Sequence, residues 1–252
     1  MTTITTSENK KIYFASDQHL GAPTPEASLP REKKFVAWLD TIKEDAGAVF
    51  LLGDLFDFWF EYKTVVPKGF VRVLGKLAEL KDAGIDIYFF VGNHDLWMRD
   101  YFQKELNIPV FHEPQEFDIN GKLFLIGHGD GLGPGDYGYK RMKKVFTFPF
   151  FKWLFRWLHP DIGVKLGHYF SVKNKLISGD EDAQFLGEEN EWLALYCRKK
   201  LTEKHYDFFI FGHRHLPLEI ELNSSSTYIN LGDWIQYFTY GEFMKTFKLK
   251  EF

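Results

Sequence analysis

Short apolar runs alternate with amphipathic stretches along the chain. The apolar runs lie at residues 11–16, 48–52, 87–91, 122–126, 208–211 and 228–231. Runs of this length that are rich in aromatic and β-branched residues, most of them followed by Gly, are typical of buried strands. Between them, residues 31–45 place apolar side chains on one helical face, and residues 67–83 begin with Pro and precede Gly84, which predicts two helices. Strands alternating with helices predict an α/β fold.

Polar clusters follow five of these runs. They are Asp17-Gln18-His19, Gly53-Asp54, Gly92-Asn93-His94-Asp95, Gly127-His128-Gly129-Asp130 and Gly212-His213-Arg214-His215. Each cluster alone is explained by a turn glycine and solvated polar side chains. Five clusters at five strand ends indicate one shared site, because ligands of α/β sheets lie beyond the carboxyl ends of the strands. The carboxylate, imidazole and amide donors, without a thiolate, suit hard to borderline divalent metal ions.

The order of these motifs resembles that of the calcineurin-like metallophosphoesterases, and the resemblance extends from Asp17 to His215. It implies a sandwich of two β-sheets flanked by helices, and two bound divalent metal ions. The implied ligands are Asp54 as the bridge, Asp17, His19 and His215 for one metal, and Asn93, His128 and His213 for the other. Such a metal pair binds phosphate oxygens, activates water for attack and stabilises the charge that develops during an in-line displacement.

Three further residues of these motifs are assigned by the resemblance. His94 is not a metal ligand in the family pattern, and we expect it to face the substrate and to protonate the leaving oxygen or stabilise the phosphoryl charge. Asp95 is expected to hold the ring and tautomer of His94. A packing role remains the alternative for His94. Asp57 either supports a metal ligand or is a solvated loop acid.

The interval between His128 and His213 is too long for a simple connection. It predicts a helical lid insertion at residues 137–199, with residues 1–136 and 200–252 forming the core. Residues 145–158 (VFTFPFFKWLFRWL) predict one apolar helix with Lys152 and Arg156 on a thin basic edge. This helix can lie in a membrane interface, line an apolar pocket for an acyl chain, or pack on the domain with its basic groups in solvent.

A second resemblance covers the whole chain. Asp136, Tyr139, the Gly-Asp-Leu-Phe at 53–56, the Gly-x-Trp at 232–234 and the Ser/Asn/Lys cluster at 171–175 resemble the bacterial UDP-2,3-diacylglucosamine hydrolases. The resemblance implies cleavage of the pyrophosphate of UDP-2,3-diacylglucosamine to UMP and 2,3-diacylglucosamine 1-phosphate in lipid A biosynthesis, with Mn²⁺ as the metal. The implied substrate-binding residues are Asn93, His94, Asp136, Tyr139, Asn174, Lys175 and His213.

One position departs from that resemblance. The best-known branch has Arg where this chain has His94, and Arg binds phosphate bidentately but cannot donate a proton at neutral pH. A metallophosphoesterase acting on a soluble nucleotide or another phosphodiester is therefore the alternative. A non-catalytic module that retains only the fold is disfavoured, because all seven predicted metal ligands are present.

Composition and charge bear on location and partners. The single cysteine, Cys197, excludes an internal disulfide, and the polar N-terminus is unlike a secretory signal. No apolar run reaches the roughly 18 residues needed to span a bilayer. We therefore expect a cytoplasmic protein, peripherally associated with the inner membrane that holds its lipid substrate. The net charge of −4 argues against nucleic acid as a partner, whereas nine Lys or Arg against one acid at residues 140–175 favour an anionic lipid partner.

Overall fold

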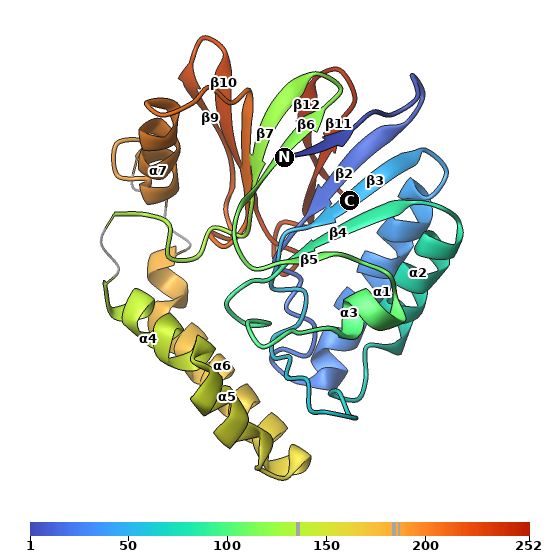
Figure 1. Cartoon of the computed structure of the whole chain (residues 1–252), viewed down its shortest axis with the longest axis vertical. Helices are drawn as coiled ribbons and strands as arrows, with labels where there is room; N and C mark the ends of the chain where they lie inside the picture. The colour runs from blue at the N-terminus through green and yellow to red at the C-terminus, as the bar shows by residue number, and fades with distance from the viewer. Residues whose placement is uncertain (135–136, 183–184, 186) are drawn as a thin grey trace.

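The computed structural model describes residues 1–134, 137–182, 185 and 187–252, and the side chains of residues 172–182 are not part of the description. Two six-stranded sheets stack face to face, with helices on their outer faces (Figure 1). The first sheet has the order β1 (Thr2–Ile4), β6 (Gln115–Ile119), β7 (Lys122–Ile126), β8 (Phe208–Phe211), β10 (Ser226–Leu231) and β9 (Pro217–Asn223). The second has the order β12 (Phe247–Glu251), β11 (Thr239–Phe243), β2 (Lys11–Ala15), β3 (Ala46–Leu51), β4 (Asp86–Phe90) and β5 (Val110–Phe111). The predicted α/β sandwich is confirmed.

Parallel pairing determines where the motif loops lie. Strands β2, β3, β4 and β5 pair in parallel in the second sheet. Strands β7, β8 and β10 pair in parallel in the first sheet. Parallel strands present their carboxyl ends at a common edge of the sheet. The polar motifs that follow the strands of one sheet therefore all lie at the same edge of that sheet.

Three apolar clusters hold the layers together. Phe14, Phe50 and Phe124 belong to the cluster between the two sheets, where their rings stack on one another. The opposite face of the second sheet packs on helices α1 (Pro25–Ile42), α2 (Val71–Asp82) and α3 (Tyr101–Glu105). The opposite face of the first sheet packs on helix α7 (Trp192–Leu201). The central strands are thus buried on both faces, as their continuous apolar runs require.

Two helices begin at residues other than those predicted. Helix α1 begins at Pro25 rather than at residue 31, because Thr24 accepts a hydrogen bond from the Ala27 amide and Pro25 suits the first turn. Helix α2 begins at Val71 rather than at residue 67, because Phe70 adopts a left-handed backbone with φ of 56° that helices do not continue through.

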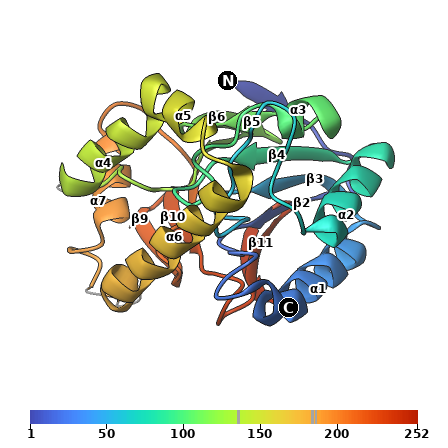
Figure 2. The same cartoon turned by 90° about the horizontal axis from the view of Figure 1, so that it is seen from below.

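The insertion differs from the prediction in its helices. Residues 145–158 are not one helix: they contain the end of α4 (Tyr137–Thr147) and all of α5 (Pro149–Arg156). Phe148 is extended, with ψ of 129°, because the residue before a proline avoids the helical region, and Pro149 then opens α5. Helix α6 (Pro160–Asp182) follows, and Figure 2 shows it crossing beside α4 and α5.

Helix α7, which was predicted to belong to the insertion, packs against the first sheet. Its residues Leu193, Ala194 and Cys197 are fully buried in the cluster on that sheet. We therefore place the end of the insertion before α7, so that α4, α5 and α6 form it. No helix in the described ranges is long and apolar enough to cross a bilayer.

Candidate metal centre

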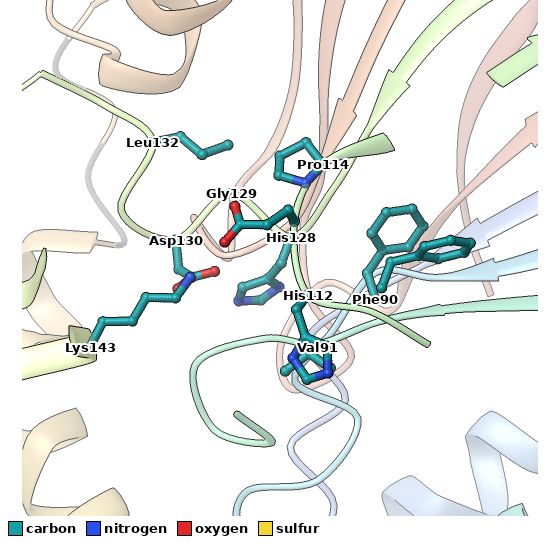
Figure 3. Close-up of a pocket in the computed structure, with 11 residues that line it drawn as sticks. Phe90, Val91, His112, Pro114, His128, Gly129, Asp130, Leu132 and Lys143 are labelled. Atoms are coloured by element: carbon teal, nitrogen blue, oxygen red, sulfur yellow. The ribbon is translucent and has the colours of Figure 1, made fainter. Parts of the chain in front are cut away.

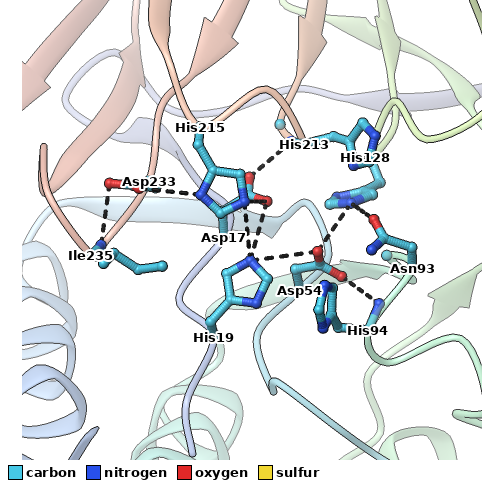
Figure 4. A network of polar contacts seen from close by, with 12 residues as sticks. Asp17, His19, Asp54, Asn93, His94, His128, His213, His215, Asp233 and Ile235 are labelled. Atoms are coloured by element: carbon cyan, nitrogen blue, oxygen red, sulfur yellow. Dashed lines mark hydrogen bonds and ion pairs between the residues drawn. The ribbon is translucent and has the colours of Figure 1, made fainter. Parts of the chain in front are cut away.

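The loops after β2 and β8 bring Asp17, His19 and His215 together (Figure 4). The two Nε2 atoms of His19 and His215 are 3.2 Å apart, and the Nε2 atom of His215 is 3.6 Å from Oδ1 of Asp17. Two ring nitrogens that each lie about 2.1 Å from one metal are separated by about 3.0–3.4 Å at tetrahedral to octahedral angles. The observed spacing therefore suits coordination of one cation by both histidines and Asp17.

A second group gathers Asp54, Asn93 and His128. The Nε2 atom of His128 is 3.2 Å from Oδ1 of Asn93 and 3.5 Å from Oδ2 of Asp54. That same Asp54 oxygen is 3.6 Å from Nε2 of His19, in the first group. One Asp54 carboxylate thus stands between the two groups, as a bridging ligand must.

His213 adjoins the second group through its ring. The centroids of the His213 and His128 rings are 5.1 Å apart, and the backbone amide of His213 donates to Oδ2 of Asp17. The three groups of potential ligand atoms within the described residues contain Asp17, His19, Asp54, His94, His128 and His215. The assignment of His213 as a metal ligand stays a prediction.

A second observation also indicates that this donor set fits a divalent cation. Oδ1 of Asp17 is buried and accepts no hydrogen bond from the described residues. A buried carboxylate oxygen without a donor costs free energy unless a cation compensates it. Divalent metal ions at this position would supply that charge, and the residues that would hold them are Asp17, His19, Asp54, Asn93, His128, His213 and His215.

The backbone at these ligands is left-handed. The φ angles of Asp17, His19 and Asp54 are 60°, 44° and 53°, and those of His213 and His215 are 70° and 53°. Residues other than Gly adopt this region rarely, at a cost of about 1–3 kcal/mol each, and such residues cluster at functional sites. Five of them in the motif loops indicate that the fold holds these side chains in place against local preference.

Gly92 allows the loops after β3 and β4 to approach each other. A Cβ atom at Gly92 would fall on the Asp54 carboxylate. The Gly92 amide donates to Oδ1 of Asp95, and the His94 amide donates to Oδ1 of Asp54 at 2.8 Å. Gly at this position is therefore required for the Asp54 carboxylate to lie against the neighbouring loop.

Charge and burial shift the pKa values of the site. Burial opposes ionisation of Asp54, but His128 and His94 hold the pKa of this carboxyl well below its usual range. Burial would lower the pKa of His128, yet the neighbouring Asp54 carboxylate raises it to about 10. Burial and the nearby His128 lower the pKa of His213 to about 3. The Asp54 carboxyl thus stays ionised, and the His128 imidazole beside it is held in its positively charged form.

His94 faces the metal groups, but Asp95 does not orient it as predicted. Asp95 uses both oxygens on backbone amides, those of Gly92 at 2.6 Å and Leu55 at 3.0 Å. The Nδ1 atom of His94 instead lies 3.0 Å from the carbonyl oxygen of Asp57 and 2.9 Å from Oγ of Ser171. The orienting role predicted for Asp95 is therefore wrong, and Asp57 and Ser171 occupy that position.

Asp57 connects the insertion to the site. Oγ of Ser171, on α6, donates to Oδ2 of Asp57 at 2.7 Å. His168, one turn earlier on α6, has Nδ1 at 3.7 Å from the same oxygen. The other oxygen of Asp57 is 3.5 Å from Nδ1 of His19 and 3.7 Å from Nδ1 of His94. Asp57 is thus a buried acid beside His19, a predicted metal ligand, and not a solvated loop residue.

The predicted substrate residues of the insertion are only partly described. Tyr139 donates its hydroxyl to Asp130, and Lys143 forms an ion pair with Asp130 at 2.8 Å. Asp136 lies outside the described residues. Asn174 and Lys175 belong to α6, and their side chains lie outside the description. Their assignments stay predictions.

A pocket opens beside His128, between the core and the insertion (Figure 3). His128, Asp130 and Lys143 contribute polar groups to its lining, and Phe90 and Leu132 contribute apolar surface. His128, a predicted metal ligand, and Lys143 thus border the same space.

Three residues of the site were missed as individual candidates. Ser171 was noted only as part of a polar cluster, and His168 lies outside every motif. Asp233 accepts from His215 at 3.2 Å. A signal for Asp233 existed, since Gly232-Asp233 repeats after the sixth apolar run the Gly-Asp pattern that follows β3.

Comparisons with known proteins agree with this geometry. The family model described as calcineurin-like phosphoesterase matches residues 10–217. The chain is 40% identical over 245 residues to a UDP-2,3-diacylglucosamine hydrolase of Porphyromonas gingivalis, covering 91% of this chain and 92% of that protein. It is 28% identical over 224 residues to a protein of the same name from Actinobacillus succinogenes, covering 89% and 92%. This protein belongs to the calcineurin-like phosphoesterase family and is a hydrolase.

Proposed function

We propose that the protein hydrolyses the pyrophosphate bond of UDP-2,3-diacylglucosamine, with two Mn²⁺ ions held by the seven predicted ligands. Water adds across the P–O–P linkage and releases UMP and 2,3-diacylglucosamine 1-phosphate, a step of lipid A biosynthesis. The relatives are named as hydrolases of this substrate, and the similarity to them extends over about nine-tenths of the chain.

The observation that carries the proposal is the position of the insertion. Helix α6 reaches the metal groups through Ser171, and the neighbouring helix α5 exposes a row of large apolar side chains. A substrate with two acyl chains and a pyrophosphate needs an apolar surface beside polar groups and metal ligands.

His94 is proposed to act as the general acid. The hydroxyl of Ser171 donates to Asp57, so its lone pair faces Nδ1 of His94, and the Asp57 carbonyl can only accept. Nδ1 therefore carries a proton. As the general acid, His94 would release a proton from Nε2, its other ring nitrogen, to the leaving oxygen.

Peripheral membrane association is the second part of the proposal. Helices α4 and α5 direct most of their aromatic side chains to the exterior: Phe146, Phe148, Phe150, Phe151, Trp153 and Trp157 are exposed. Phe155 alone of the α5 rings packs inward among the described residues, 4.7 Å from the Phe60 ring and 4.6 Å from the Trp97 ring. The basic edge was expected to face lipid phosphates, but Lys152 and Arg156 lie half-buried.

Other basic groups can serve the lipid phosphates. Arg141, Lys144 and Lys165 are exposed on α4 and α6. An apolar face flanked by cations is the composition of helices that lie in an anionic bilayer surface. The proposed location is therefore the cytoplasmic surface of the inner membrane.

The test compares two substrates that differ only in acylation. With Mn²⁺ present, detergent-dispersed UDP-2,3-diacylglucosamine and UDP-N-acetylglucosamine are assayed for UMP release. We expect the acylated substrate to have a kcat/KM at least about 100-fold higher. This ratio corresponds to about 2.8 kcal/mol, and burial of two acyl chains contributes more than that. Turnover of UDP-N-acetylglucosamine without turnover of the lipid would instead support a hydrolase acting on soluble nucleotides.

A further inference from the structure

Asp233 uses its two carboxylate oxygens for different tasks. Oδ1 accepts from the backbone amides of Ile235, Gln236 and Tyr237, at 3.2, 2.8 and 3.0 Å. Oδ2 lies 3.2 Å from Nδ1 of His215 (Figure 4). Asp233 itself is buried, with 4% of its surface exposed. The loop after β10 thus fixes one oxygen and presents the other to a predicted metal ligand.

The surrounding backbone fixes this arrangement. The Trp234 amide donates to the carbonyl oxygen of Asp17 at 3.1 Å, and the Thr239 amide donates to that of Asp233 at 3.2 Å. The side chain of Asn230 donates to the carbonyl oxygen of Gly212, just before the His213–His215 segment. The loop after β10 therefore contacts the Asp17 and His215 loops together.

A carboxylate at Nδ1 decides which nitrogen of His215 can bind metal. A carboxylate only accepts, so it keeps the proton on Nδ1 and leaves the lone pair on Nε2. The Nε2 atom is the one that faces Nε2 of His19 and Oδ1 of Asp17. A carboxylate that accepts from the second nitrogen also raises the basicity of a ligating imidazole.

We propose that Asp233 is a positioning residue that sets the tautomer and orientation of His215 and thereby the affinity of one of the two metal sites. The inference rests on the metal centre of the proposed function but not on its substrate. It predicts a loss of metal affinity that is confined to the site containing His215.

The substitution Asp233→Asn distinguishes an effect on His215 from a purely structural role in the loop. Asn has one carbonyl oxygen, whereas Asp233 uses two acceptor oxygens. If the Asn oxygen caps the three amides, its NH₂ group faces His215 and favours the tautomer that carries the proton on Nε2. Asp118→Asn is the matched control, because Oδ1 of Asp118 accepts from the Gly121 amide in the turn between β6 and β7.

The experiment titrates Mn²⁺ into metal-free wild type, Asp233→Asn and Asp118→Asn by calorimetry. We expect one of the two binding steps of Asp233→Asn to weaken by about 10–100-fold, the cost typical of removing such a partner, with the other step unchanged. In a His215→Gln background, Asp233→Asn should cause no further loss, because the residue it acts through is gone. Absence of Mn²⁺ binding by the wild type would refute the metal centre itself.

Two results would overturn the inference. The first is that both Mn²⁺-binding steps of Asp233→Asn have the same affinities as those of Asp118→Asn. The other is equal weakening of both steps together with a lower melting temperature of the metal-free variant, which would mean loss of the loop cap. Histidine ¹⁵N NMR spectra of wild type and Asp233→Asn, both loaded with Zn²⁺, give an independent readout. If Asp233 had a purely structural role, His215 would keep its Nδ1–H tautomer in the variant.

Discussion

The outward aromatic face of α5 predicts membrane binding that two substitutions should remove. Trp153 and Trp157 are 51% and 75% exposed. Large aromatic side chains offer about 150–250 Å² each, so these two expose roughly 300 Å² together. At about 25 cal/mol per Å², entry of half of this area into the interface contributes about 4 kcal/mol. Trp153→Ser/Trp157→Ser should therefore lower vesicle partitioning by several hundred-fold, at about 1.4 kcal/mol per tenfold.

The assay is cosedimentation with vesicles of phosphatidylethanolamine and phosphatidylglycerol. Val71→Ser is the control, because Val71 is 74% exposed but lies at the start of α2, outside the insertion. The double variant should melt at the same temperature as the wild type, because neither exposed side chain belongs to the buried core. Unchanged vesicle partitioning would refute the reasoning, and so would a wild-type oligomer that the double variant converts to monomer, since the aromatic face would then join copies of the chain.

Further predictions concern the centre, the insertion and the cysteine. Asp54→Asn should weaken both metal sites at least about tenfold, because the bridging charge is lost; elemental analysis after dialysis measures this, and loss of one metal alone would argue against a bridge. His94→Ala should slow turnover by about 10²–10⁴-fold with both metals retained, and release of a metal would show that His94 is a ligand. Gly167→Leu should raise KM for the lipid about tenfold at unchanged metal affinity, because a Cβ atom there would fall on the Phe58 ring and displace α6; an unchanged KM would show that α6 docking is dispensable. Burial raises the pKa of the Cys197 thiol well above its usual value, so the folded protein should resist iodoacetamide at pH 8 until urea is added, as mass spectrometry would report.

Much of the fold was predictable because apolar runs and strands coincide. The runs at 122–126 and 208–211 match β7 and β8 residue for residue, and the motif after each run lies at the strand end. Burial on both faces makes these runs continuous, so their pattern is strong. The start of α1 was not predicted, because Pro30 inside a helix contradicts local preference and tertiary packing overrides it.

The site was predictable in its residue types but not in its partners. The predicted metal ligands follow strand ends in sequence, whereas Ser171 lies on a helix and contacts Asp57 from 114 positions away in the chain. Spacing in the chain carries no signal for such a contact. The break between α4 and α5 was visible in the sequence, because the residue before Pro149 avoids the helical region. The side of α5 that faces outward depends on Phe155 docking against Phe60 and Trp97, which only the fold decides.

Each predicted metal draws ligands from both layers of the sandwich. Asp17 and His19 follow β2 of the second sheet, whereas His215 follows β8 of the first, and Asn93 and His128 are divided in the same way. Cations bound there would therefore crosslink the two sheets, in addition to the apolar cluster that packs between them. By mass action, a cation at 100 times its Kd adds about 2.7 kcal/mol to the free energy of unfolding. Chelation should therefore stop turnover and also weaken the packing of the two sheets on each other. Proteases should then cleave the metal-free protein faster than the metal-bound protein.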